Sequence, residues 1–402
     1  MDIRGFIALQ INMEGGISTK HHICSSNLRY LAALLAIVIT AVLTGCTDGS
    51  EAEEQLDNSL FLLNLPANRW VKYHELKGGD WWRKGHAGLA YDSTRGSLLV
   101  FGSDTHGEDW DNVVHEFILR QREWVHHGVN AHPDTYHINS EGYPVAGDMN
   151  LAPWAMHTYD GVDYDPVLDA LVVVASPDHN PIVKKRPAPQ SHPVWIFHLK
   201  TKKWSIFENK HGPGRFFGAA IAYDDADNNL FFCKSGLWVL NLTKEKLERI
   251  DKAANCLHRT MAFDSWRRNI NIFGSYRGTS NVSRFNIDLY SEESENWEEL
   301  TPKGDHCPPY SKVPVAFDEK AGVFLLVVDD PKSTIEKKPE TATTFIYDPG
   351  TNTYKKLNDT KLPAAGMNFM MAWDKIHEVF FLLTGNLEDG ISVWALRLDR
   401  NQ

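Results

Sequence analysis

The sequence lacks both an excess of positive charge and an apolar segment long enough to cross a bilayer. Its 402 residues include 41 Lys and Arg against 52 Asp and Glu, which gives a formal net charge of −11 at pH 7. Nucleic-acid-binding proteins concentrate positive charge, so this balance predicts that the chain has no nucleic-acid partner. The N-terminal apolar stretch Leu31–Leu43 is shorter than the roughly 20 residues that a membrane-spanning helix needs. It therefore does not predict a transmembrane anchor.

Common catalytic signatures are absent as well. The sequence has no GxSxG nucleophile elbow, no HExxH zinc motif, no phosphate-binding glycine loop and no repeated Asp box of the sialidase type. Paired carboxylates for glycoside hydrolysis stay open as an alternative, because any two acidic side chains can meet in a fold. Asp109, Asp134 and Asp178 are the first candidates for such a pair.

The first 46 residues have the pattern of a targeting segment. Lys20 and Arg29 precede the apolar stretch Leu31–Leu43, which ends in the tetrapeptide LTGC at Cys46. This pattern resembles a bacterial lipoprotein signal with its lipobox, which implies cleavage before Cys46 and acylation of its thiol. The resemblance implies a chain held at the bacterial outer membrane or cell surface by lipid alone. We therefore divide the chain into a signal peptide (1–45), an acidic tether (46–66) and one large domain (67–402).

Cysteine is scarce, with five residues in the whole chain. Cys24 is lost with the signal and Cys46 is the lipidated residue, which leaves Cys233, Cys256 and Cys307. An odd number permits one disulfide at most and raises the alternative of a metal site.

Two short motifs could supply the ligands of such a metal site. Cys256 with His258, and His306 with Cys307, offer two thiolates and two imidazoles. Four such ligands suit a tetrahedral Zn²⁺ with a structural role. A Cys256–Cys307 disulfide and free thiols are the competing interpretations.

Repeated short hairpins dominate the rest of the sequence. An apolar run ends six times in an aromatic residue followed by aspartate, and a second apolar run follows a few positions later. The pairs are Tyr91-Asp92, Tyr164-Asp165, Tyr223-Asp224, Phe263-Asp264, Phe317-Asp318 and Trp373-Asp374. Each aspartate can cap the turn backbone, so each unit predicts a β-hairpin. A third strand and a fourth, usually with Trp or Tyr, follow most hairpins, which is the strand count of a propeller blade.

This order of strands resembles the kelch repeat over roughly residues 70–400. The resemblance implies an all-β fold, a kelch-like β-propeller of six four-stranded blades. The sixth unit lacks a fourth strand, while the segment NRWVKYHEL near residue 70 is a fourth strand without a blade. We expect this N-terminal strand to close the ring and leave no open sheet edge. A seventh blade stays open, because Gly128–Pro153 is long enough to contain further strands.

Histidine, tyrosine and basic residues gather in the loops that a propeller would bring to one face. Counting five residues back from each aromatic-Asp pair gives the expected start of each innermost strand. These positions are His86, Tyr159, Gly218, His258, Lys312 and Asn368. Imidazole, phenol and cationic groups suit β-elimination on a uronic-acid polysaccharide, which needs a base, an acid and a cation for the carboxylate.

Propeller-type ulvan lyases of marine bacteria are similar in using two histidines about 20 residues apart, with a tyrosine and an arginine downstream. His137 and His157 have that spacing. The resemblance implies that they form an acid–base pair, with Tyr159 as proton donor and Arg215 as cation. No cofactor is required for this chemistry.

The predicted partner is an anionic polysaccharide, and we expect the protein to be a monomer. Further basic and aromatic residues would bind this substrate. The predicted substrate-binding residues are Lys184, Lys185, Arg186, Arg277 and Trp110. The alternative is a non-catalytic glycan- or protein-binding kelch propeller. Such a module would depend on exposed aromatics such as Trp110 and Trp154 rather than on histidine.

Overall fold

The computed structural model describes twelve stretches of the chain. They are residues 49–77, 86–107, 109–147, 152–177, 192–208, 211–252, 256–275, 278–289, 297–330, 341–358, 362–386 and 390–399. Cys46, Asp178, Lys184, Lys185, Arg186 and Arg277 lie outside them. The chain divides into two compact units, Met1–Asp57 and Asn58–Gln402. The structure thus places the boundary before Asn58, whereas the sequence analysis placed it at residue 67.

Helix α3 (Gly49–Leu63) crosses this boundary, and its last residues belong to the larger unit. Leu62 is fully buried, and Leu65 just beyond the helix is nearly so, in a cluster that also contains Tyr73. The Asn58 side-chain amide donates to the carbonyl oxygen of Arg120 at 2.7 Å. The C-terminal part of the predicted tether is therefore packed structure. In the described residues, no helix is both long and apolar enough to span a membrane.

The larger unit is built from antiparallel sheets, which confirms the predicted all-β class. The first sheet contains β2 (Gly88–Asp92), β3 (Ser97–Phe101), β4 (Val114–Ile118) and β5 (Glu123–His127), and the second β9 (Val162–Asp165), β10 (Ala170–Val173), β11 (Val194–His198) and β12 (Lys203–Phe207). The third contains β13 (Ala220–Asp224), β14 (Asn229–Cys233), β15 (Leu237–Asn241) and β16 (Lys246–Asp251), and the fourth β17 (Thr260–Asp264), β18 (Asn269–Phe273), β19 (Val282–Asn286) and β20 (Trp297–Leu300).

The last two large sheets depart slightly from this plan. The fifth contains β22 (Val315–Asp318), β23 (Val323–Asp329), β24 (Thr341–Asp348) and β25 (Thr353–Lys356), with β21 (Lys303–Gly304) added parallel to β25 and β26 (Leu362–Pro363) on β24. The sixth contains β27 (Met371–Asp374), β28 (Val379–Asn386), β29 (Gly390–Leu396) and, from the other end of the unit, β1 (Val71–Leu76). β1 pairs antiparallel with β29, from Val71 opposite Ala395 to Leu76 opposite Ile391. The N-terminal strand thus completes the last sheet, as predicted.

The aromatic-Asp turns form as the sequence predicts. Asp92 Oδ1 accepts hydrogen bonds from the backbone N–H groups of Thr94 at 2.8 Å and Arg95 at 2.9 Å. The same side-chain-to-backbone bonding recurs at Asp165, Asp224, Asp264, Asp318 and Asp374. An aspartate that accepts from the residues two and three positions later satisfies the orphan donors of the turn, so each hairpin is fixed locally.

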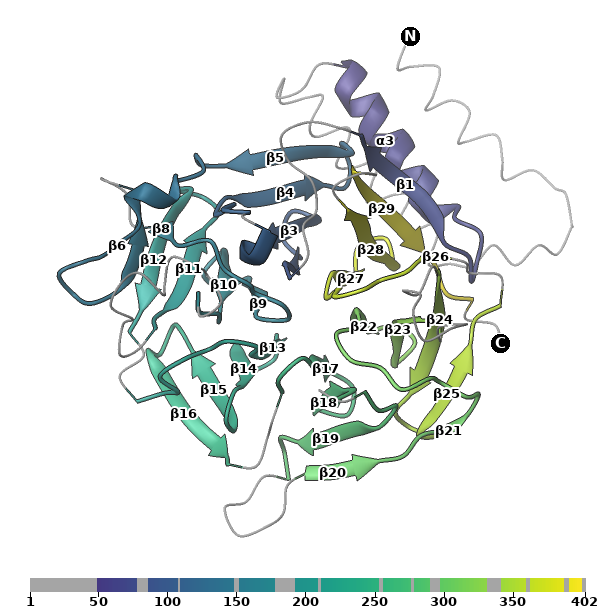
Figure 1. The fold of residues 1–402 in the computed structure, drawn as a ribbon. Coiled ribbons are helices and arrows are strands. Elements are labelled where there is room, and N and C mark those ends of the chain that lie inside the picture. Colours follow the sequence, from purple (N-terminus) through teal and green to yellow (C-terminus); the bar gives the residue numbers. More distant parts are fainter. Residues whose placement is uncertain are drawn as a thin grey trace, which may run out of the picture. The chain divides into compact units, whose positions relative to one another are not determined.

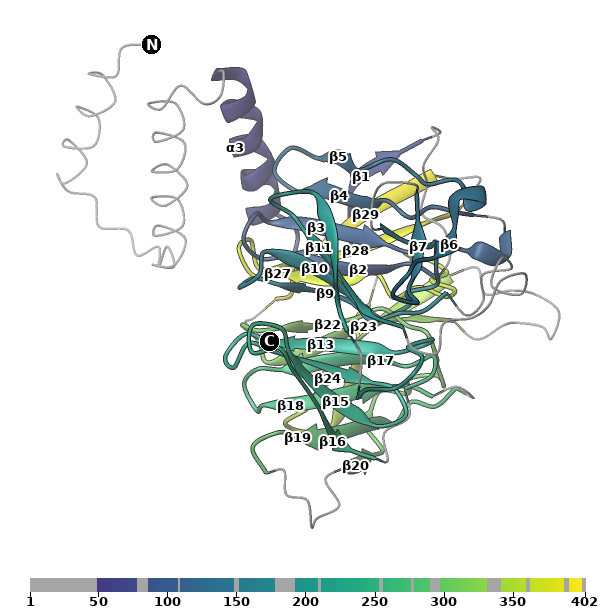
Figure 2. The same ribbon diagram turned by 90° about the vertical axis from the view of Figure 1, so that its left-hand side faces the viewer.

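The first strands of the six large sheets form a closed series of contacts within the described residues. β2 contacts β9, and the series continues through β13, β17, β22 and β27 back to β2. Figure 1 shows these strands around the middle of the unit, with β5, β16 and β20 toward the outside, and Figure 2 shows the unit turned by 90°. A cavity of about 220 Å³ lies between the first strands. It is lined by the aromatic residue of every aromatic-Asp pair and by Asp160 and Asp163.

The segment that could have held a seventh blade forms a smaller sheet. Its strands β6 (His137–Ile138), β7 (Pro144–Ala146) and β8 (Ala152–Pro153) make three strands in the order β6-β7-β8. Trp154 follows this sheet and is 1% exposed, stacked on Tyr136 at 5.4 Å between ring centroids. The expectation that Trp154 is an exposed binding aromatic is therefore wrong, because its ring fills the core beneath this sheet.

Candidate functional site

Backbone contacts join the first and second sheets where the strands β2 and β9 begin. The carbonyl oxygen of His86 accepts from the N–H groups of Thr158 at 3.0 Å and Tyr159 at 2.9 Å. The Thr158 hydroxyl accepts from the Gly88 N–H at 2.9 Å and donates to the Phe101 carbonyl oxygen at 2.7 Å. These bonds hold the segments before the two strands in a fixed relation.

Two glycines make this approach close enough. A Cβ on Gly88 would lie 2.2 Å from the carbonyl oxygen of Tyr159, and one on Gly102 would lie 2.3 Å from Thr158 Oγ1. Gly102 also has a φ of +116°, which favours glycine. Any side chain at either position would push the two segments apart.

Three histidines meet at this seam between the sheets. The rings of His86 and His157 stack with centroids 4.2 Å apart and planes within 8°. The ring of His106, from the loop between β3 and β4, lies edge-on to both, 4.7 Å from His157 and 6.1 Å from His86. His86 and His157 are buried, whereas His106 is exposed. Solvent therefore reaches the group through His106.

A carboxylate completes the group. Asp104 Oδ1 lies 3.6 Å from His86 Nε2 and 3.7 Å from His157 Nε2, and one third of its side chain is exposed. The same oxygen accepts from the backbone N–H of His106 at 3.1 Å. The ligand atoms of His86, Asp104 and His157 all lie within 4.8 Å of one another, so these three residues could hold a metal ion.

Tyr159 links this group to the middle of the unit. Its hydroxyl lies 3.0 Å from His157 Nδ1, and its ring contacts the rings of His86, Phe217, His258 and Phe369 at centroid distances of 5.3 to 5.5 Å. Burial, with a smaller effect from the charge of Asp104, raises the pKa of Tyr159 well above its ordinary range. The phenol therefore stays protonated at neutral pH and can donate a proton.

The backbone at the start of the inner strands is unusual. His86, Tyr159, His258 and Lys312 all have φ between +51° and +68°, as does Gly218 at +69°. Non-glycine residues rarely adopt this left-handed conformation, and it persists where the surrounding structure imposes it. Here it directs the side chains of His86, Tyr159 and His258 toward one another, as their ring contacts show. The sequence analysis identified this set of positions correctly.

No protein-family model and no curated protein sequence matches the chain.

The two histidines of the predicted acid–base pair lie on different elements. His137 is exposed on β6, where its Nδ1 lies 2.9 Å from the carbonyl oxygen of Thr135. His157 is 2% exposed beside Tyr159, at the seam between the first two large sheets. The 20-residue spacing thus puts His137 in the small sheet β6–β8, and its pairing with His157 stays a prediction.

Other predicted residues have mixed outcomes. Arg215 is exposed and directly precedes Phe216 and Phe217, and the latter ring contacts Tyr159. Trp110 is half-buried against the cluster of Tyr136 and Trp154, and its carbonyl oxygen accepts from the Tyr136 hydroxyl at 3.4 Å. Arg215 thus lies two residues before a ring that contacts Tyr159, while Trp110 packs against the core cluster of the small sheet.

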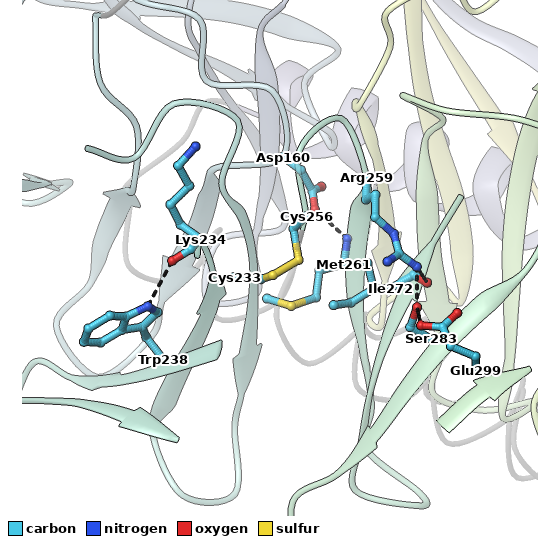
Figure 3. The surroundings of a disulfide bond; sticks show 10 residues. All are labelled: Asp160, Cys233, Lys234, Trp238, Cys256, Arg259, Met261, Ile272, Ser283 and Glu299. Atoms are coloured by element: carbon cyan, nitrogen blue, oxygen red, sulfur yellow. Dashed lines mark hydrogen bonds between the residues drawn. A yellow bond between two sulfur atoms is a disulfide. The ribbon is translucent and has the colours of Figure 1, made fainter. Parts of the chain in front are cut away.

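The predicted zinc tetrad is wrong because Cys256 forms a disulfide with Cys233. This bond joins the end of β14 to the segment before β17, and Figure 3 shows it with Met261 and Asp160 nearby. The Met261 N–H donates to Asp160 Oδ2 at 2.6 Å. Cys307 is buried and unpaired, and burial raises the pKa of its thiol to about 12. A sulfur held in a disulfide is not available as one of the two thiolate ligands.

Sequence reasoning missed Asp104 and left His86 and His106, both among the histidines of the predicted face, outside its predicted site. The signal for His86 was present, since it occupies the first position in the inner-strand series. Asp104-Thr105-His106 follows the second strand of the first hairpin, and an aspartate there can turn the chain by accepting from the N–H two residues later. Only the approach of the second sheet shows that these side chains meet His157.

Proposed function

We propose that the larger unit is a kelch-like β-propeller with six blades. The proposal is supported by the six large sheets, by the closed series of first-strand contacts and by the pairing of β1 with β29. The three strands β6–β8 are then an insertion between the first two blades. The lipobox at Cys46 supports a lipoprotein at the bacterial outer membrane or cell surface.

We further propose that the protein acts on an anionic, uronic-acid-containing polysaccharide by β-elimination. The observation that carries the proposal is the exposed imidazole of His106 over the buried His157–Tyr159 pair. In the reaction, the bond between C5 and its proton breaks, a double bond forms between C4 and C5, and the C4–O4 bond breaks. His106 accepts the C5 proton, and Tyr159 protonates the departing O4.

We assign the uronate carboxylate to basic residues that neighbour Phe217 and His258, two ring partners of Tyr159. Arg215 precedes Phe217, and Lys234 Nζ lies 5.9 Å from the centroid of the Phe217 ring. Lys312 lies beside His258, whose carbonyl oxygen accepts its backbone N–H at 3.1 Å. Cations placed where charge develops stabilise the enolate-like transition state. Lys184, Lys185, Arg186 and Arg277 stay predicted contacts to the polymer.

The test follows the ultraviolet absorbance of the unsaturated uronyl product. Full-length protein in detergent is incubated with a panel of uronic-acid polysaccharides that includes ulvan. We expect turnover that His106→Ala and Tyr159→Phe each reduce by about 10²- to 10⁴-fold. His137→Ala is the matched control and should turn over normally, because that histidine lies on β6. Binding of a polysaccharide without product would contradict the proposal and indicate a non-catalytic binding propeller.

A further inference from the structure

The spacing of His86, Asp104 and His157 is not that of a hydrogen-bonded group. The two distances from Asp104 Oδ1 to the histidine Nε2 atoms are 3.6 and 3.7 Å. Both exceed the 2.7 to 3.2 Å range, roughly, of N–H···O hydrogen bonds. Two ligands of one tetrahedral zinc ion, each about 2.1 Å from the metal, lie about 3.4 Å apart. The observed spacing is close to that of ligands around a shared ion.

A second histidine group on the first sheet shows the contrast. His115 Nε2 lies 2.7 Å from Asp111 Oδ2, and its Nδ1 lies 2.6 Å from His126 Nδ1. These are hydrogen-bond distances, so those side chains contact one another directly and leave no room for an ion between them. Two groups of the same composition, one within the first sheet and one at its seam with the second, thus differ in the gap between their polar atoms.

The orientation of His157 suits a metal ligand. Its Nδ1 faces the hydroxyl of Tyr159 at 3.0 Å, while its Nε2 points toward Asp104, with Thr105 Oγ1 at 3.2 Å. A partner on Nδ1 fixes the tautomer, and an ion at Nε2 would replace the hydrogen bond to Thr105. The backbone bonds between the two sheets fix the positions of both histidines, and their stacked rings, now within 8° of parallel, would turn about χ2 so that both Nε2 atoms point at the ion.

The group is also open on one side. Asp104 is 34% exposed and His106 lies at the solvent side of the stacked rings. Structural zinc sites have four protein ligands, whereas catalytic sites have three and leave a position for water or substrate. Three ligands with a solvent-facing side therefore match a site that can take an outside ligand.

We propose that His86, Asp104 and His157 bind one divalent transition-metal ion of the zinc class, with an open position that faces His106. In the elimination reaction this position would take the uronate carboxylate oxygen. That role rests on the proposed function, but the binding of the metal does not. The ligand set is two imidazoles and one carboxylate, which suits zinc and its neighbours better than calcium or magnesium.

The test measures metal binding directly. Full-length protein in detergent is stripped with a chelator and titrated with Zn²⁺ by calorimetry, and Co²⁺ is added in parallel as a visible-absorbance probe. We expect one equivalent with tetrahedral-type cobalt absorbance in the wild type. Asp104→Asn and His157→Ala should each weaken this binding at least about 100-fold, and Tyr159→Phe about 10-fold. His137→Ala is the control and should bind as the wild type does.

Specific outcomes would overturn the proposal. Asp104→Asn is nearly isosteric at a partly exposed position, so its fold can be verified by circular dichroism. Unchanged zinc affinity in folded Asp104→Asn, or no binding by the wild type, rules the site out. Elimination that persists in metal-free protein removes the catalytic role and leaves the proposed function intact. Metal binding that depends on Asp104 without elimination on any substrate leaves the site intact and contradicts the lyase.

Discussion

Two seams between neighbouring sheets use equivalent positions for opposite purposes. Seven residues before the aromatic of the aromatic-Asp pair stands His157 in the second sheet and Cys256 in the fourth. His157 shares the first seam with His86 and Asp104, while Cys256 is bonded to Cys233 across the seam between the third and fourth sheets. The first seam is held by hydrogen bonds of Thr158 and by close glycines instead. The difference teaches that a position used for a covalent cross-link at one seam is occupied by an imidazole at the other, where hydrogen bonds hold the sheets together.

The largest expected effect comes from closing the space at the first seam. Gly102→Ala should lower the free energy of unfolding by about 4 kcal/mol, because the new Cβ meets Thr158 and the backbone has a positive φ. Urea denaturation measures the loss. Gly128→Ala is the matched control, since Gly128 has a φ of +108° with nothing within 4 Å of an added Cβ. It should cost only about 1 kcal/mol, and equal losses would show that close packing does not matter at Gly102.

Removing the disulfide from the seam between the third and fourth sheets should have the next largest effect on stability. Cys233→Ala with Cys256→Ala opens a loop with a sequence separation of 23 residues. The chain-entropy relation gives a loss of about 3 kcal/mol for such a loop. Denaturation of the wild type under reducing conditions should show a similar midpoint. Metal binding at the first seam should survive, and its loss would mean that the two seams are not independent.

The hydrogen bonds of the first seam can be tested one side chain at a time. Thr158→Val keeps the shape of the residue but leaves the Gly88 N–H and the Phe101 carbonyl oxygen without their partner. Unsatisfied buried groups should lower the free energy of unfolding by about 2 kcal/mol. Thr158→Ser keeps the hydroxyl and should lose less. A larger loss of unfolding free energy in Thr158→Ser than in Thr158→Val would mean that packing of the Thr158 methyl group, not its hydroxyl, stabilises the seam.

The smallest effect is expected at the cavity that both seams adjoin. Burial in the cavity wall raises the pKa of Asp163 to about 7, and nearby Asp225 adds to the rise. The folded state then holds the proton more tightly than the unfolded chain, so stability is full at low pH and declines as pH rises toward 7. Asp163→Asn should remove this decline and gain stability at pH 8, by less than the roughly 1.4 kcal/mol per pKa unit of an unscreened shift because the residue is half-buried, with little change at pH 4. Urea denaturation of the wild type and the variant at pH 4 and pH 8 measures this difference. An equal effect of the substitution at both pH values would contradict the raised pKa of Asp163.

Local features of the fold could be predicted because each depends on residues that are close together in the sequence. The aromatic-Asp turns follow from the aspartate and its next three residues, and β1 was recognised as a strand without a blade of its own. The positions of His86, Tyr159 and His258 followed from counting along these turns. Strand period and turn chemistry act over a few residues, so they survive any error in the global arrangement.

The remaining features depend on which sheets become neighbours. The partner of Cys256 is Cys233, at the end of β14, rather than Cys307, although the fourth sheet neighbours both the third and the fifth. His137 lies on β6 of the small sheet, and the number of residues between His137 and His157 does not show that the two belong to different sheets. Asp104 and His106 reach His157 only across a seam. None of these distances is encoded in the number of residues between the partners.

The pairing of β1 with β29 has a consequence for biosynthesis. β1 leaves the ribosome before the strands of the other five large sheets, and its partner β29 follows all of them. Local hairpins can form as they emerge, whereas the contact of β1 with β29 has to wait until the sheets between them have been made. Until then β1 is an unpaired strand, and the adjoining core residues Tyr73 and Leu62 lack the cover of Phe381 and Val393. A nascent chain of this protein therefore exposes the edge of β1 and this part of the core until β29 emerges.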